Sequence, residues 1–422
     1  MRILKDIEEL LENKVITEET ASGIRTFYQG KKEGSQNRLF AIFGILGALL
    51  VGLGVVLIIA HNWDNMSRGI QTLLAFLPLL IAQGLVVYSM WQKPNELAWV
   101  EGSAILLFFA IGACISMISQ IYHVTGNIGD YLFTWMILAL PIVYLLPSSI
   151  VAIFYLLGIT YMGLETGYFN THSYTVFNKY WLMLLALLPY YFFLQKNRNS
   201  SNFLNFFNWL IPISVVMCLG MFADHNVEWL LLAYMSLFGI LYGLGRMDHW
   251  FEQSYNSNGF KFLGSLGMVA ILLISSFRAF WKEFKLNDNA FSSEEFYIFI
   301  VLTILAIIIN AYSSYQTKKW NPKQWLFLLF IPLFFMGLQG DLVVILMNVL
   351  VLAIGVQTIR EGAYKEHLGH LNYGLLIIAA LVACRFFDSN LSFVFRGLLF
   401  ILVGLGFFFV NYWMINRRKS DV

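Results

Sequence analysis

Long apolar runs separated by short polar segments are the feature that most constrains how this 422-residue chain can fold. A bilayer core of about 30 Å is crossed by a helix of about 20 apolar residues, within a working range of about 17–25. Backbone groups in hydrocarbon find no water to hydrogen-bond, so only helices and closed barrels span it. The run lengths match helices and therefore predict an all-α fold, a polytopic transmembrane helical bundle.

The apolar runs predict about fourteen transmembrane helices. They cover residues 40–60, 69–91, 97–121, 132–146, 149–169, 179–194, 207–223, 227–245, 260–281, 296–315, 325–339, 342–359, 373–387 and 393–414. The junctions at Pro147 and Asp341 are tight. A junction lying inside the membrane would lower the count, so twelve helices also fit.

Composition and tryptophan placement agree with a membrane protein. Hydrophobic residues make up 59% of the chain and charged residues 12%, whereas soluble domains have about 45–50% and about 25%. All 12 Trp residues lie at or near a predicted helix end, where the indole ring favours the headgroup boundary. The lipid bilayer is therefore the expected partner. A net charge of +2 is too small to indicate a nucleic-acid partner.

The distribution of Lys and Arg predicts the topology. With the N-terminus in the cytoplasm and alternating helices, most of the 27 Lys and Arg residues fall on the cytoplasmic side, as the positive-inside rule expects. Both ends of the chain are basic, so the rule requires an even number of helices. The sequence thus predicts a transmembrane domain over residues 39–416 and a basic cytosolic tail over residues 417–422.

Residues 1–38 form a predicted cytosolic helical hairpin and linker. Ile3, Ile7 and Leu10 recur at helical spacing, and Thr17 is a plausible N-cap of a second short helix. An αα-hairpin of this size buries too little surface to be stable alone. We therefore expect it to dock on the membrane domain, on a second copy in a homodimer, or on a protein partner.

Three separate pieces of the chain resemble a known family. They are the hairpin at residues 10–19, the end of the first apolar run at residues 60–64, and residues 120–123 followed by Trp135 and Pro141. Together they resemble the bacterial predicted membrane proteins grouped as domain of unknown function 2157. The resemblance covers the N-terminal third of the chain. It implies a location in the bacterial inner (plasma) membrane and no established activity, so it implies no catalytic or binding residues.

Polar side chains near predicted helix ends are the candidates for a site, because ionisable groups are costly in a bilayer. These candidates are His61, Asp64, Glu101, Gln120, His123, Asp130, Arg385 and Asp388. They indicate a polar site or a proton path, or alternatively interfacial snorkelling and structural pairing. Arg385 and Asp388 are three residues apart and close enough to pair on one helix face.

No cofactor or metal is expected. Cys114, Cys218 and Cys384 lie in apolar runs without CxxC spacing, which is typical of packed thiols. The sequence Glu-His-Leu-Gly-His at residues 366–370 is not the HExxH zinc motif. The chain also lacks a Walker A sequence, a Rossmann glycine fingerprint and a GxSxG elbow.

Three functions remain open, and the sequence leans against an enzyme. The first is a secondary transporter or lipid/glycan flippase for a small-molecule or lipid substrate, in which ion coupling would need the amides of Gln83, Gln120, Asn310 or Asn348. The second is a membrane-embedded enzyme acting on a lipid-linked substrate. It requires that His61, Asp64, Glu101, His123 and Asp130 converge on the outer face. The third is a non-catalytic sensor or assembly factor that docks through the N-terminal hairpin.

Overall fold

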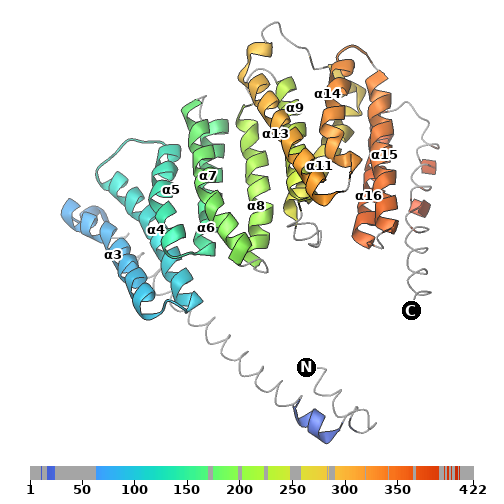
Figure 1. Ribbon diagram of the computed structural model, residues 1–422. Coiled ribbons are helices and arrows are strands. Elements are labelled where there is room, and N and C mark those ends of the chain that lie inside the picture. The colour runs from blue at the N-terminus through green and yellow to red at the C-terminus, as the bar shows by residue number, and fades with distance from the viewer. Residues whose placement is uncertain are drawn as a thin grey trace. The chain divides into compact units, whose positions relative to one another are not determined.

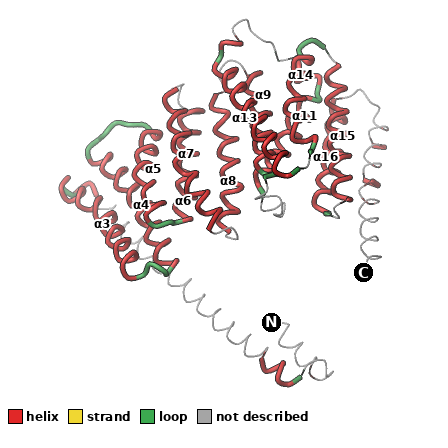
Figure 2. Tube along the Cα trace, viewed as in Figure 1, coloured by secondary structure: helices red, strands yellow, loops and turns green. Residues whose placement is uncertain are grey.

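In the residues that the computed structural model describes, helices are joined by loops and turns (Figures 1 and 2). These are residues 11, 17–23, 63–169, 174–197, 202–222, 227–247, 258–282, 284, 290–318, 320–340, 342–364, 367–388, 394, 397–398, 401, 404–406 and 408. Over these residues no strand occurs, which confirms the predicted all-α class.

The chain divides into two units, Met1–Leu77 and Pro78–Val422. In the first unit, the Thr20 amide donates to the Thr17 hydroxyl (3.4 Å), as expected of an N-cap at Thr17. The Gln71 side chain donates to the Trp63 carbonyl oxygen at 2.8 Å. The boundary falls at Pro78, which lies inside a helix.

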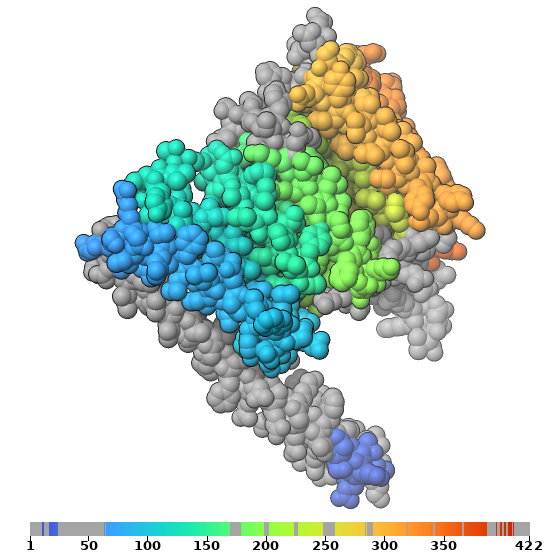
Figure 3. Space-filling model, turned by 60° about the vertical axis from the view of Figure 1, so that its left-hand side comes forward, coloured from blue at the N-terminus to red at the C-terminus, as the bar shows by residue number. Residues whose placement is uncertain are grey.

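The helices follow one another along the chain with short connections. They are η1 (Trp63–Asn65), α3 (Arg68–Gln92), α4 (Leu97–Ile121), α5 (Ile128–Leu145), α6 (Ser149–Leu164), η2 (Glu165–Phe169), α7 (Tyr174–Asn197), α8 (Asn202–Leu219), η3 (Gly220–Phe222), α9 (Val227–Leu244), α11 (Gly259–Ser275), α12 (Arg278–Lys282), η5 (Ala290–Ser292), α13 (Glu294–Thr317), η6 (Pro322–Trp325), α14 (Leu326–Gly337), α15 (Leu342–Tyr364) and α16 (Leu368–Asp388). The most extensive packing joins α15 to α16, and α9 to both α13 and α11. Figure 3 shows α4 to α8, coloured teal to green, as one continuous band of side chains.

Twelve of the predicted transmembrane runs correspond to helices α3–α9, α11 and α13–α16. The run at 40–60 and most of the run at 393–414 lie outside the described residues. Within the described part of the chain, nine helices are long and apolar enough to cross a membrane, and α11 and α14 are shorter apolar helices. Pro189, Tyr190 and Tyr191 lower the hydropathy of α7, which is not among the nine.

Large apolar side chains cover the outside of the bundle. Leu182 is 65% exposed and Ile308 is 58% exposed, although both lie well inside long helices. Exposed apolar surface of this extent is typical of a lipid-facing exterior. The structure therefore agrees with a multi-pass helical membrane bundle.

One predicted helix is broken in the structure. The run at 260–281 was expected to be continuous, but α11 ends at Ser275 and α12 begins at Arg278. The Ser276 hydroxyl donates to the Leu273 carbonyl at 2.6 Å, and the Trp281 indole donates to the Ser275 carbonyl at 2.7 Å. These side chains take over carbonyls at the helix end, which favours a break at this point.

A close helix crossing holds α9 against α11. A Cβ atom on Gly264 would lie 2.5 Å from the backbone nitrogen of Tyr242 and 2.8 Å from the carbonyl oxygen of Phe238. Only glycine permits this approach, as small residues do at membrane helix interfaces. The crossing places the last turn of α9 beside the first turns of α11.

Candidate functional site

Glu101, one of the predicted site residues, is a buried structural acceptor. It lies in the first turns of α4 and is 6% exposed. Its carboxylate accepts hydrogen bonds from the Ser149 amide (2.9 Å), the Ile150 amide (3.3 Å) and the Ser148 hydroxyl. The Ser148 hydroxyl in turn accepts from the Val151 amide as the N-cap of α6. Glu101 therefore completes the N-terminus of α6, where a negative charge is favourable.

The expectation that Glu101 joins Asp130 on the outer face is wrong. Glu101 contacts Ser148, just after the C-terminal end of α5, whereas Asp130 lies in the first turn of α5. The 18 residues of α5 separate the two carboxylates by about 27 Å. The alternating topology predicted from Lys and Arg already implied this separation, because α4 and α5 run antiparallel and begin at opposite ends.

Three predicted residues lie at the α4–α5 connection. Asp130 is exposed, accepts from the Asn127 side chain, and lies 3.6 Å from the Lys179 ammonium. The Lys179 ammonium also lies 4.4 Å from the centre of the Phe133 ring. Gln120 and His123 are exposed, and His123 has a positive φ of 52°. An exposed ion pair of this kind stabilises a protein by only about 0–1 kcal/mol.

Arg385 joins α16 to the break between α11 and α12 through hydrogen bonds. Its guanidinium donates to the Ser276 carbonyl (2.8 Å) and to the Ser276 hydroxyl (3.1 Å), and it lies 5.0 Å from the centre of the Phe277 ring. Asp388 ends α16, but its side chain lies outside the described residues, as does that of Asp64 in η1 and all of His61. The predicted pairing of Arg385 with Asp388 therefore remains a prediction.

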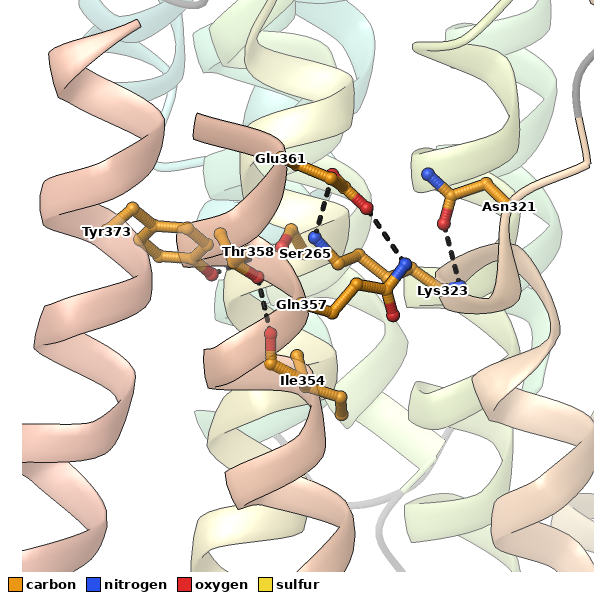
Figure 4. A network of polar contacts seen from close by, with 8 residues as sticks. All are labelled: Ser265, Asn321, Lys323, Ile354, Gln357, Thr358, Glu361 and Tyr373. Atoms are coloured by element: carbon orange, nitrogen blue, oxygen red, sulfur yellow. Dashed lines mark hydrogen bonds and ion pairs between the residues drawn. The ribbon is translucent and has the colours of Figure 1, made fainter. Parts of the chain in front are cut away.

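A group of charged side chains that the sequence analysis missed is buried at the opposite end of the second half of the bundle. The Lys323 ammonium lies 3.1 Å from the Glu361 carboxylate, and the Lys323 side chain is only 8% exposed. The Gln357 amide donates to the other Glu361 oxygen at 2.8 Å. Figure 4 shows Lys323 of η6 and Glu361 of α15 facing each other, with Gln357 beside them. We call these residues, together with Tyr242 and Arg246, the Lys323–Glu361 cluster.

Tyr242 and Arg246 extend the cluster to α9. Both side chains are buried. Arg246 and Glu361 both act electrostatically on the Tyr242 hydroxyl, so the three groups lie near one another. Residues from the end of α9, from η6 and from α15 thus meet at one place.

Local structure explains why Lys323 points inward. Asn321 is the N-cap of η6 and accepts from the Lys323 amide at 2.9 Å, and Pro322 occupies the first turn. The following Gln324 donates to the Ser313 hydroxyl (3.3 Å) at the end of α13. The cap and the proline fix the direction of the chain as it re-enters the bundle. Lys323 consequently enters between helices instead of extending into solvent.

A second set of contacts fixes the end of α9 near Arg246. The Asn258 side chain donates to the Gly245 carbonyl at 2.6 Å and also caps α11 by accepting from the Lys261 amide at 3.0 Å. A Cβ atom on Gly245 would lie 2.5 Å from the Lys261 nitrogen. Next to these contacts, the Ser265 and Tyr373 hydroxyls hydrogen-bond at 3.2 Å between α11 and α16 (Figure 4).

The sequence contained a partial signal for this cluster. Lys and Arg residues between the predicted helices, Lys323 among them, were used only to predict which side of the membrane each connection faces. The Asn-Pro pair before Lys323 is a helix-start signal that brings the next residue into the first turn. No periodicity, however, shows that helices more than a hundred residues apart bring Tyr242 and Glu361 together.

The described residues contain no group of three or more His, Cys, Asp or Glu side chains placed to hold a metal ion. Cys114 and Cys218 are buried cysteines, Cys384 is half-buried, and none of the three forms a disulfide within the described residues. The chemistry available in the Lys323–Glu361 cluster is therefore that of charged side chains, hydroxyls and amides: it can bind, orient and neutralise a polar ligand.

The helical architecture and the lipid-facing exterior define a multi-pass helical membrane protein. In a comparison with known families, residues 8–152 match the family described as predicted membrane protein, DUF2157. The match confirms the resemblance over the N-terminal third of the chain. No match was found to a curated protein or to a solved structure. The matched segment ends before the Lys323–Glu361 cluster begins, so the family description says nothing about that cluster.

Proposed function

We propose that the protein is a secondary transporter or lipid/glycan flippase that recognises its substrate with the Lys323–Glu361 cluster. The observation that carries the proposal is the burial of Lys323, Arg246 and Tyr242 beside Glu361 at shared helix ends. Buried ionisable groups in a membrane protein are costly and mark substrate or ion pathways.

A series of buried polar side chains leads from the cluster toward the middle of the bundle. The Asn310 amide on α13 donates to the Gly239 carbonyl on α9 at 3.0 Å. Farther along, the Ser236 and Thr303 hydroxyls hydrogen-bond at 2.8 Å between the same two helices. The Asn310 side-chain oxygen is fully buried and has no hydrogen-bond partner in the part of the chain that is described. Asn310 is one of the four amides that the sequence analysis named for ion coupling, and an unused buried acceptor supports that role.

Proline positions also support transport. Pro141, Pro189, Pro212 and Pro332 all lie inside helices. Each proline removes one backbone donor and weakens its helix locally. Transporters form their substrate sites from helices that are weakened or discontinuous near the middle of the membrane, and these prolines weaken helices that are continuous here.

The flux experiment uses the full-length protein in liposomes. We expect protein-containing vesicles to move a fluorescent phospholipid or a polar solute across the bilayer faster than protein-free vesicles. Asn310→Leu fills the same space without polar atoms and should lower this flux while leaving insertion intact. Gln92→Leu, at an exposed position at the end of α3, is the matched control and should leave the flux unchanged. Failure of the protein to move any lipid or solute tested would remove the transport proposal.

We further propose that the protein resides in the bacterial inner membrane with both termini in the cytoplasm. The positive-inside rule supports this orientation. It places the α3–α4 connection and the Lys323–Glu361 cluster on the cytoplasmic side, and the α4–α5 connection on the outer side.

Labelling of single cysteines tests the orientation. In a protein whose 3 native cysteines are replaced by serine, we expect Lys93→Cys and Lys318→Cys to react with a membrane-impermeant reagent only from the cytoplasmic side. Asn127→Cys should react only from the outside, because one helix separates it from Lys93. Labelling of Lys93→Cys and Asn127→Cys from the same side would contradict the topology.

A further inference from the structure

An open groove lies between α3 and α4, close to the connection that joins them. Its volume is about 360 Å³, within the range of about 300–1,000 Å³ that is usual for small-molecule sites. The groove is lined by one residue of α3 and five residues of α4, which are Leu85, Ala98, Trp99, Gly102, Ser103 and Leu106. Because most of these residues are apolar, the groove suits an apolar ligand.

The groove is continuous with the lipid-facing exterior of the bundle. Ala98, Gly102 and Leu106 are all exposed on its α4 wall. Within the described part of the chain, α3 is the least buried of the nine long apolar helices: 11% of its most apolar stretch is buried, compared with 61% in α9. Most of the surface of α3 therefore faces hydrocarbon. A lipid chain can enter the groove sideways from the bilayer without crossing the protein.

The length of the groove matches one leaflet of a bilayer. Ala98 and Leu106 are two turns apart on α4, a rise of about 12 Å. One leaflet of a hydrocarbon core of about 30 Å is about 15 Å thick. Trp91 near the end of α3 and Trp99 near the start of α4 mark the headgroup boundary. The Tyr88 ring lies 5.3 Å from the Trp99 ring and joins the two helices at this level. The groove thus runs from the headgroups into the hydrocarbon, as an acyl chain does.

Gly102 keeps the groove open. A Cβ atom at this position would have no heavy atom within 4 Å. At Gly264, by contrast, a Cβ atom would collide with the backbone of α9, so the missing side chain there permits a helix crossing. Glycine inside a helix costs about 1 kcal/mol relative to alanine. At Gly102 no close helix contact accounts for that cost, and the missing side chain leaves room in the groove instead.

We propose that the groove between α3 and α4 is a lipid-binding site that holds one acyl chain of a membrane glycerophospholipid. The chain lies along Gly102, between Leu85 and Leu106, and its headgroup lies at the α3–α4 connection. The bound lipid fills the space that the two helices leave between them. This site is separate from the Lys323–Glu361 cluster, and it does not depend on transport.

Binding is measured on the full-length protein in neutral detergent. The probe is a phosphatidylglycerol that carries a photoactivatable diazirine in one acyl chain, and mass spectrometry of peptides locates its adducts. We expect saturable labelling of the α4 wall of the groove, stronger than labelling of the exposed face of α13. Unlabelled phosphatidylglycerol should compete, whereas glycerol phosphate, the headgroup without chains, should not. Phosphatidylglycerol should also raise the melting temperature, because a ligand that binds only the folded state stabilises it.

Two glycine substitutions separate the groove from the rest of the lipid-facing surface. Gly102→Leu places a side chain in the groove and is expected to lower its labelling at least about tenfold, because the chain and the leucine cannot occupy the same space. Gly84→Leu is the matched control. Gly84 is an exposed glycine of α3, has equally open space around it, and does not line the groove. Both variants should fold at least as stably as the wild type, since leucine favours a helix over glycine.

Saturable labelling that is lost in Gly102→Leu and kept in Gly84→Leu supports the site, whether or not any flux is found. Labelling of α13 as strong as that of the groove, or an equal loss in both variants, overturns it. Competition by glycerol phosphate identifies a headgroup ligand and also counts against an acyl chain. In a protein whose 3 native cysteines are replaced by serine, a disulfide between two copies of Gly102→Cys would identify a second copy as the occupant. Where Gly102→Leu does not fold, Ala98→Leu on the same wall decides, and unchanged labelling in that variant contradicts the proposal.

Discussion

Replacing Glu101 with alanine is expected to destabilise the protein by about 3 kcal/mol, because the substitution leaves two buried donors and one half-buried donor without their acceptor. The Ser149 and Ile150 amides and the Ser148 hydroxyl all donate to this carboxylate. Glu101→Gln keeps one acceptor oxygen but turns an amide NH₂ toward donors, so a loss of about 1–2 kcal/mol is expected. The loss should appear first as fraying of the start of α6.

The melting temperature of each purified variant in detergent measures this effect. Glu96→Ala is the matched control, because Glu96 is an exposed carboxylate one turn before Glu101 and pairs only with exposed Lys93 among the contacts described here. We expect the order of stability to be wild type and Glu96→Ala first, then Glu101→Gln, then Glu101→Ala. Equal melting temperatures for Glu101→Ala and Glu96→Ala would show that the carboxylate does not hold α6.

The helices were predictable from sequence because their signal is local. The run at 97–121 coincides with α4, and the run at 342–359 lies within α15. Length and hydropathy decide such segments by themselves, since a helix in hydrocarbon satisfies its own backbone. The break at Ser276 was not predictable in this way, because it depends on side-chain bonds that compete with an otherwise apolar run.

The candidate site was less predictable, because burial depends on which helices meet. Glu101 and Asp130 look alike in sequence: each is an acid near the start of an apolar run. One is buried as a helix cap and the other is exposed beside Lys179. Lys323 was counted as a cytoplasmic surface charge, yet the fold places it against Glu361. These differences arise from tertiary contacts between distant segments, and a single sequence contains no record of them.

The Lys323–Glu361 pair should show a distinctive order of stability. Glu361→Met removes the carboxylate that lies 3.1 Å from the deeply buried Lys323 ammonium, and a loss of about 3 kcal/mol is expected. Lys323→Met is expected to cost less, about 1–2 kcal/mol, because Glu361 is partly exposed and keeps its hydrogen bond from Gln357. The double variant should be close to wild type, since replacing a whole buried pair by apolar residues is often neutral.

Melting temperatures of the four proteins form a double-mutant cycle that measures the coupling of the two charges. Additive losses would show that Lys323 and Glu361 do not act as a pair. The double variant also separates structure from function. A pair that serves only folding predicts that this variant, being stable, behaves as wild type in every assay. A role in substrate recognition predicts instead a stable protein that has lost the flux of the wild type, because the cation proposed to meet the substrate is gone while the bundle around it remains intact.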